Sequence, residues 1–89
     1  MKLLVIYRPN SEHARSVDDF VREFSRRNPG GKMELLNIDT RDGMATASLY
    51  DIMQYPAILA LRGDGSVLSA WQGAQLPLLN EVAGYAYQN

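Results

Sequence analysis

The sequence predicts a single α/β domain in which three helices flank a four-stranded mixed sheet, in the order βαβαββα. Apolar runs without alternation at residues 3–7 and 57–61 are typical of strands that are covered on both faces. Between them, residues 14–24 repeat apolar side chains at the spacing of one helical face. Gly63-Asp64-Gly65 then separates two strand-like runs, as a hairpin turn does. The 89 residues are enough for one domain, spanning 1–89.

The first strand and helix come directly from this pattern. The strand covers Leu3 to Tyr7 and ends at Pro9. The segment after it offers Asn10 and Ser11 as N-cap residues for the first helix. The inner face of that helix consists of apolar residues three and four apart, namely Ala14, Val17, Phe20, Val21 and Phe24.

The next two elements are a strand from Met33 to Asp39 and a second helix that follows the loop at residues 40–43. A β–helix–β unit with a right-handed crossover makes the first two strands parallel. The predicted inner face of the second helix consists of Ala45, Leu49, Ile52 and Met53.

Residues 50–61 are the stretch around which the chain is organised. A helix end passes into Tyr55-Pro56, and an apolar strand, Ala57 to Leu61, follows at once. Proline has no amide hydrogen and pushes the preceding residue out of the helical region, so the helix must end by Gln54. A proline in this position, with an aromatic residue before it, is a candidate for a cis peptide bond.

The last strand, residues 67–72, returns antiparallel after the hairpin and ends at Gly73. Pro77 suits the first turn of a final helix. The residues expected on the inner face of this helix are Leu78, Leu79, Val82, Tyr85 and Ala86.

The composition excludes several classes of function. The chain has a net charge of −1, so no overall field attracts nucleic acid or an anionic membrane. It contains no cysteine and therefore no disulfide, thiolate metal ligand or thiol nucleophile. The apolar run at the N-terminus is too short for a signal sequence or a membrane span, and we expect a cytoplasmic protein.

Two strings of this sequence resemble thioredoxin. The segment from Tyr50 to Arg62, YDIMQYPAILALR, is similar to the family's YGIRGIPTLLLFK, in which the proline is cis. Leu36-Asn37-Ile38-Asp39 is similar to the strand that precedes the family's next helix. The resemblance implies a thioredoxin-like fold over nearly the whole chain, without the family's additional N-terminal strand and helix.

The chain departs from this family at the redox centre. The family's WCGPCK motif corresponds to residues 10–15, where Ser11 and Ala14 replace the two cysteines. The buried aspartate that helps to move protons corresponds to Val5, and the lysine beside it to Leu35. Thiol–disulfide exchange requires a thiolate, so we expect a domain that is not a thiol–disulfide enzyme.

Ser11, Glu12 and His13 lie where the first helix begins. A Ser–His pair for nucleophilic catalysis is one hypothesis. However, residues two apart do not face each other on a helix, and no acid is placed to orient the histidine. One histidine cannot form a metal site, and we expect no cofactor. We therefore interpret Ser11 as a helix N-cap, followed by two exposed polar residues.

Other residues leave two interpretations open. Trp71 is expected either at the edge of the sheet as an interface residue or beneath the last helix. Tyr85 and Tyr87 could support a weak dimer, although packing or exposure to solvent is the simpler interpretation. The arginines of the first helix alternate with acidic residues, which favours a solvated, ion-paired face over a nucleic-acid site.

The resemblance implies a surviving binding groove beside the proline. In the family this groove holds extended peptide through backbone hydrogen bonds, a form of strand addition. Its expected residues here are Pro9, Asn10, Ser11, Tyr55, Pro56, Gly73 and Ala74.

Three hypotheses about function follow. The first is a redox-inactive thioredoxin-like domain that binds a protein or peptide. The second is a glutathione- or small-thiol-binding protein of the glutaredoxin type. The third is a switchable interaction module like the cyanobacterial clock protein KaiB, which also lacks the cysteine pair.

Overall fold

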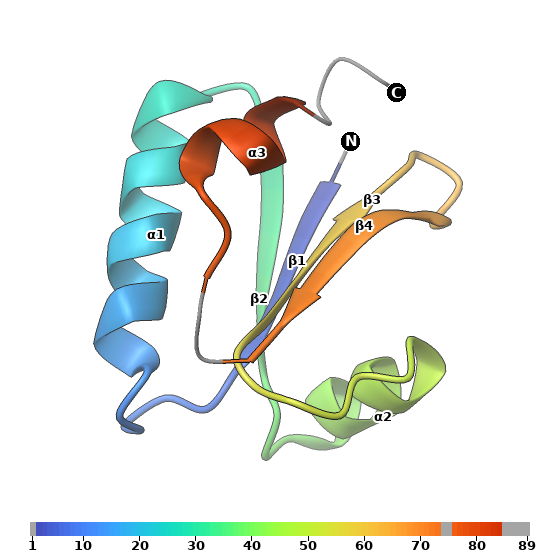
Figure 1. Cartoon of the computed structure of the whole chain (residues 1–89). Helices are drawn as coiled ribbons and strands as arrows, with labels where there is room; N and C mark the ends of the chain where they lie inside the picture. The colour runs from blue at the N-terminus through green and yellow to red at the C-terminus, as the bar shows by residue number, and fades with distance from the viewer. Residues whose placement is uncertain (1, 74–75, 85–89) are drawn as a thin grey trace.

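The computed structural model describes residues 2–73 and 76–84, which form four strands and three helices in the predicted order (Figure 1). Among these residues, no helix is long and apolar enough to cross a membrane. The elements are, in chain order, β1 (Lys2–Tyr7), α1 (Ala14–Arg27), β2 (Lys32–Asn37), α2 (Arg41–Leu49), β3 (Ala57–Leu61), β4 (Val67–Gln72) and α3 (Leu79–Gly84).

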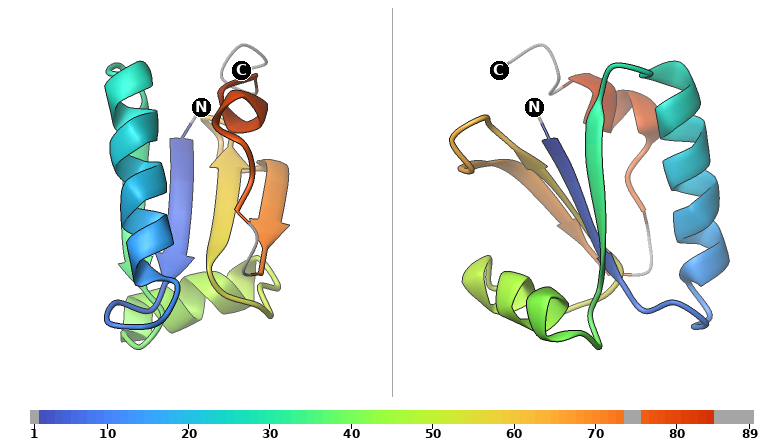
Figure 2. Two further views of the ribbon diagram at one scale, coloured as in Figure 1. Left: turned by 60° about the vertical axis from the view of Figure 1, so that its left-hand side comes forward. Right: turned by 180° about the vertical axis from the view of Figure 1, so that it is seen from behind.

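The strands form one mixed sheet in the order β2-β1-β3-β4. β1 and β2 are parallel, and β3 is antiparallel to both β1 and β4. α1 and α3 cover one face of the sheet, and α2 lies on the other face, near the end where β1 and β2 finish (Figure 2). This arrangement is the predicted α/β architecture with a four-stranded mixed sheet flanked by three helices.

Two apolar cores lie on the two faces of the sheet. Leu3 and Val5 pack with Phe20 and Phe24 of α1 and with Val82 of α3. The intervening β1 residues Leu4 and Ile6 point to the other face, where they pack against residues of α2 and β3. A central strand with both faces covered buries every side chain, which explains the unbroken apolar runs in β1 and β3.

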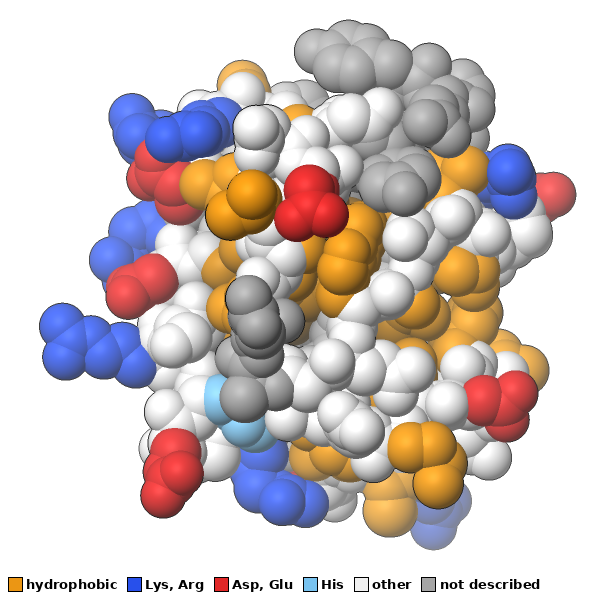
Figure 3. Space-filling model, viewed as in Figure 1, with side chains coloured by type: hydrophobic (Ala, Val, Ile, Leu, Met, Phe, Trp, Pro, Cys, Tyr) orange, Lys and Arg blue, Asp and Glu red, His pale blue; other side chains and the backbone are white. Residues whose placement is uncertain are grey.

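The solvent face of α1 is ion-paired, as expected. Charged side chains of both signs gather over this helix (Figure 3). Glu23 accepts hydrogen bonds from Arg26 and from Arg27, the latter at 2.9 Å. These arginines are therefore neutralised locally by an acid of the same helix.

The predicted inner face of α2 is wrong at three of its four positions. The helix begins at Arg41 and ends at Leu49, and its buried residues are Gly43 and Ala47. Ala45, Leu49 and Met53 are exposed, whereas Ile52 is buried just beyond the helix. The backbone of α2 approaches β2 so closely that only small residues fit between them. A Cβ atom built on Gly43 would lie 1.9 Å from the carbonyl oxygen of Asn37.

Smaller differences concern the ends of elements. β2 ends at Asn37, so Asp39 lies in a turn rather than in the strand. Leu78 precedes α3 and is exposed, whereas Leu79 packs against the core. Trp71 is half-buried on the edge strand β4 and packs against the core beneath α1 and α3. The expected positions of Tyr85, Ala86 and Tyr87 lie outside the described residues.

Candidate functional site

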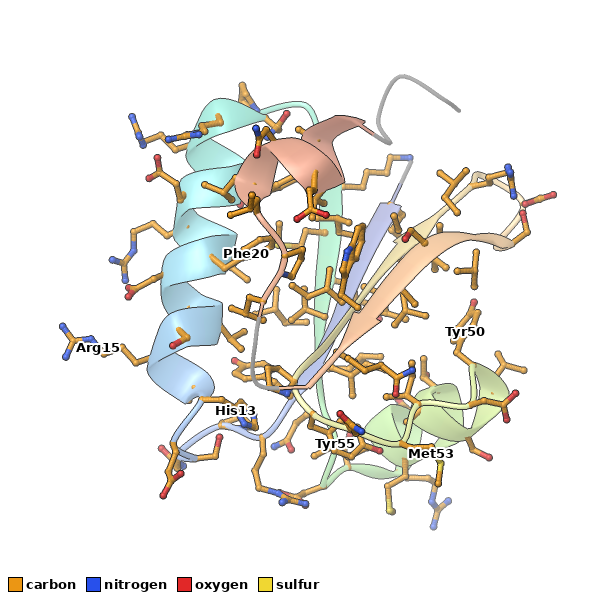
Figure 4. The ribbon with its side chains drawn as sticks, in the orientation of Figure 1. His13, Arg15, Phe20, Tyr50, Met53 and Tyr55 are labelled. Atoms are coloured by element: carbon orange, nitrogen blue, oxygen red, sulfur yellow. The ribbon has the colours of Figure 1, made fainter. Side chains whose placement is uncertain are left out.

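Three loops meet at the end of the sheet where β1 and β2 finish and β3 begins. They are the β1–α1 loop at residues 8–13, the β2–α2 turn at residues 38–40 and the segment before β3 at residues 50–56. Figure 4 shows His13 of the first loop and Tyr55 of the third at this end, while Arg15 of α1 points away into solvent. Parallel strands bring their carboxyl ends to the same edge, which is why the first two loops are neighbours.

Arg8, the first residue of the β1–α1 loop, connects two of these loops. Its guanidinium donates to both carboxylate oxygens of Asp39, at distances of 3.0–3.2 Å. Its backbone N–H donates to Nε2 of His13 at 3.2 Å, and its carbonyl accepts the hydroxyl proton of Ser11 at 2.5 Å. The hydrogen bonds with Asp39 raise the pKa of the Arg8 guanidinium, which stays cationic.

The arrangement around Arg8 argues against nucleophilic catalysis by Ser11 and His13. The hydroxyl of Ser11 donates to the Arg8 carbonyl, and Nε2 of His13 accepts from the Arg8 amide. Nucleophilic catalysis instead needs the serine hydroxyl to donate to the imidazole. The two side chains therefore fix the shape of the loop and do not activate one another.

The expected N-caps of α1 are wrong. The N-cap is His13, whose side chain makes no capping hydrogen bond, and the helix begins at Ala14. Asn10 has a φ of 65°, a left-handed conformation that asparagine tolerates in turns. Glu12 is exposed as expected, but His13 is half-buried. The turn is closed instead by a bond from the Ala14 amide to the Ser11 carbonyl.

The segment before β3 is held by β4. The side-chain oxygen Oε1 of Gln72 accepts hydrogen bonds from the amides of Met53 and Gln54, at 2.9 and 3.3 Å. The amide of Gly73 donates to the carbonyl of Pro56 at 3.0 Å. The Tyr55–Pro56 peptide bond is cis. Together these contacts fix the backbone on both sides of Tyr55.

Tyr55 lies at the centre of the candidate site. Within residues 2–73 and 76–84, neither its amide nor its carbonyl has a hydrogen-bond partner. Its half-buried side chain lies beside Arg8, and its hydroxyl is 3.5 Å from the carbonyl oxygen of Ile52. Pro56, which follows it, is fully buried and supports the loop from beneath.

Four of the predicted groove residues line hollows of the surface. Pro9, Asn10 and Ser11 line a hollow of about 490 Å³ with the outer face of α1, whereas Tyr55 lines another of about 450 Å³ beside α2. Gly73 is half-buried at the end of β4, and Ala74 lies outside the described residues. Tyr55 shares its hollow with residues of α2 and with Arg8 and Asp39.

We call the second cavity the α2 hollow. Two of its residues are strongly exposed methionines, Met44 at 55% and Met53 at 83%. Methionine side chains are flexible and polarisable and adapt to varied apolar partners. The α2 hollow is lined by Arg8, Ile38, Asp39, Met44, Ala47, Ser48, Ile52, Met53 and Tyr55.

The sequence analysis missed Arg8, Gln72 and, apart from Tyr55, all the residues that line the α2 hollow. Arg8 and Asp39 each follow one of two parallel strands, and this placement is a signal that could have paired them. No sequence signal identifies the contact of Gln72 with residues 53 and 54. Among the described residues, no group of three potential metal ligands comes together.

The two other positions that depart from thioredoxin's redox centre are neighbours. Val5 of β1 and Leu35 of β2 are partners in the parallel register. Val5 is completely buried, and Leu35 is 40% exposed. Apolar side chains thus occupy both positions, and neither of them can carry a proton.

Comparison with solved structures identifies the fold. Thioredoxin O2 of Arabidopsis thaliana superposes with a TM-score of 0.73 at 13% sequence identity, covering 98% of this chain and 72% of that protein. Mitochondrial thioredoxin 3 of Saccharomyces cerevisiae gives a TM-score of 0.73 at 11% identity, with coverage of 99% and 77%. Thioredoxin 1 of Thermosipho africanus gives 0.72 at 9%, with coverage of 99% and 92%.

At the level of sequence, no family model and no curated protein matches the chain. The structural likeness extends over nearly all of its length, and the sheet order and helix placement agree with it. With serine and alanine at positions 11 and 14 and no cysteine elsewhere, these 89 residues lack the thiols of a redox centre. The chain has a thioredoxin-like fold without the cysteine pair.

Proposed function

We propose that this redox-inactive thioredoxin-like domain binds an extended segment of a partner protein along the backbone at Tyr55. The observation that carries the proposal is the combination of an unpaired Tyr55 backbone, within the described residues, and the apolar α2 hollow beside it. Strand addition uses free backbone groups for affinity and neighbouring pockets for the choice of side chain. Tyr55 belongs to both components here, because it also lines the α2 hollow.

The hollow favours an uncharged peptide with a large apolar side chain. The positive charge of Arg8 is already paired with Asp39, so it offers little attraction to an anionic ligand. Met44 and Met53, which line the hollow together with Ile52, supply flexible apolar contacts. A short strand over a small area leaves little surplus over the entropic cost of association, so we expect affinity in the micromolar range or weaker.

An NMR titration with extended peptides that contain leucine, methionine or phenylalanine tests this proposal. We expect shift changes at residues 53–56 and 72–73 and around Met44. Met53→Glu introduces a charge at an exposed position and is expected to weaken binding at least tenfold. Leu49→Glu is the matched control, because Leu49 is also exposed, at 74%, but does not line the α2 hollow.

Glutathione provides the competing ligand in the same experiment. Saturable glutathione shifts around residues 9–11 and 55, without any response to the peptides, would favour the small-thiol hypothesis. Equal losses for the Met53 and Leu49 variants would contradict a role for the α2 hollow. Peptide-induced shifts restricted to Trp71 and α3 would place the interface elsewhere.

A further inference from the structure

β4 is an edge strand with no charged residue. Its sequence, VLSAWQ, contains neither a charge nor a proline, the features with which edge strands usually block pairing with another chain. The opposite edge, β2, carries Lys32 and Glu34, and Glu34 is ion-paired with Lys2. Figure 2 shows β4 at the margin of the sheet, with α1 and α3 over the face and not over the edge.

Within residues 2–73 and 76–84, no further strand pairs with the outer edge of β4, and its backbone presents hydrogen-bonding groups there. At one end Gly73 donates to Pro56 of the β3 side, and at the other end Arg62 donates to Ser66. In an antiparallel pair, residues alternate between those that bond the partner strand and those that point away. Trp71 and Ser69 therefore bond β3, and the N–H and C=O of Ala70, between them, point outward.

We propose that a second copy of this chain pairs with β4 antiparallel, centred on Ala70, to form a continuous eight-stranded sheet. The axis of symmetry passes between the two Ala70 residues, which exchange N–H···O=C hydrogen bonds. Ser69 of each copy then lies opposite Trp71 of the other. Residues that lie opposite each other in paired strands point to the same face of the sheet. The sheet face that α1 and α3 cover in one copy therefore continues into the same face of the other copy.

The chemistry of β4 favours a second copy over an unrelated strand. Self-pairing places no like charges opposite each other, since the strand is neutral along its length. At the centre, the exposed side chain of Ala70 is small enough for two strands to approach. Next to it, Trp71 and Ser69 make a large–small pair in both halves of the interface, as a two-fold axis requires.

Charge variants at the centre test the pairing. Light scattering over a concentration series up to the millimolar range should show the native chain approaching twice its monomer mass. Ala70→Lys and Ala70→Glu should each remain monomeric, because like charges would face each other across the axis. An equimolar mixture of the two variants should restore the dimer. Ser16→Lys, at an exposed position on α1, is the control and should dimerise like the native chain.

A single cysteine gives an independent test in this cysteine-free chain. Hydrogen-bonded partners in antiparallel strands have Cα atoms about 5.5 Å apart, within disulfide range. Ala70→Cys should therefore form a covalent dimer under mild oxidation at least tenfold faster than the Ser16→Cys control. A native chain that stays monomeric throughout, charge variants that still dimerise, or a mixture that stays monomeric would each overturn the proposal. Each variant's circular dichroism is compared with the native spectrum to verify folding.

Discussion

At the scale of single residues, Gln72 connects β4 to the loop of the candidate site. Its Oε1 atom accepts from the amides of Met53 and Gln54 and so fixes the loop before Tyr55. We expect Gln72→Leu to destabilise the fold by about 1 kcal/mol, the usual net value of a hydrogen bond, and to weaken peptide binding. Urea unfolding and amide exchange at residues 53 and 54 measure the two effects.

Gln72→Glu is the matched variant, because a carboxylate keeps the acceptor oxygen in the same place. It should retain slow exchange at Met53 and Gln54. If both variants exchange equally fast, the loop is held by something other than this acceptor.

Single residues also show where the sequence was insufficient. The cysteine positions could be assigned to Ser11 and Ala14, since they follow from the resemblance. The side-chain partners could not be predicted, because Ser11, His13 and Asp39 all bond to Arg8 in an irregular loop. Hydrogen bonds in such a loop depend on its backbone path, which has no periodic sequence pattern.

At the scale of elements, α2 depends on one glycine. Gly43 lies in its first turn, where an added Cβ would clash with the backbone of Asn37. Gly→Ala normally favours a helix. Here we expect Gly43→Ala to destabilise the domain by ~1–3 kcal/mol, the usual cost of overpacking. Thermal or urea unfolding measures the change.

Gly84→Ala supplies the control within α3. Among the described residues, a Cβ there would meet no atom within 4 Å, so the substitution should be neutral or stabilise the fold by ~0.4–1 kcal/mol. Similar unfolding curves for both variants would show that the close approach of α2 to β2 is not maintained in solution.

The turn of the β3–β4 hairpin contains a hydrogen-bonded aspartate. Asp64 accepts hydrogen bonds from the amide and hydroxyl of Ser66, at 3.0 and 2.7 Å, and the amide bond in particular lowers the pKa of Asp64. A carboxyl whose pKa is lower in the folded state stabilises that state above its unfolded pKa. This contribution is lost as the pH falls through the folded pKa.

We therefore expect the amide proton of Ser66 to shift and to exchange faster as the pH falls below the ordinary range of aspartate. In Asp64→Asn the amide oxygen still accepts, but it does not titrate, so the Ser66 signal should stay constant over that range. NMR spectra across the acid range give this measurement. A Ser66 shift that persists in the variant would show that another carboxyl is responsible.

The contrast between α1 and α2 explains which elements the sequence could predict. The inner face of α1 is defined by large residues, Val17, Phe20 and Phe24, so its periodicity is clear. α2 packs through Gly43 and Ala47, which carry almost no hydrophobic signal, while its larger apolar residues remain exposed. When a helix packs against a strand through small residues, the spacing of its larger apolar residues does not indicate the buried face.

At the scale of the whole molecule, the order of elements and the sheet arrangement could be predicted with few differences. Every central strand is buried on both faces, which leaves a strong and unbroken apolar signal in β1 and β3. The fold could therefore be predicted from apolar runs that are visible in the sequence. The candidate site depends on how three loops meet, which no single segment of the sequence encodes.

The fold as a whole also permits a direct test of the lost redox centre. The Ala14 amide bonds the Ser11 carbonyl at 3.2 Å, so the two positions lie on one turn at the start of α1. Ser11→Cys together with Ala14→Cys should form one internal disulfide under mild oxidant without unfolding the domain, as mass spectrometry and circular dichroism would show. Ser11→Cys alone is the control and should form only intermolecular products.

The double variant should still reduce insulin poorly, because the proton-carrying aspartate of thioredoxin is replaced by buried Val5. Failure of the two cysteines to pair would mean that residues 10–15 do not form a thioredoxin-like turn in solution.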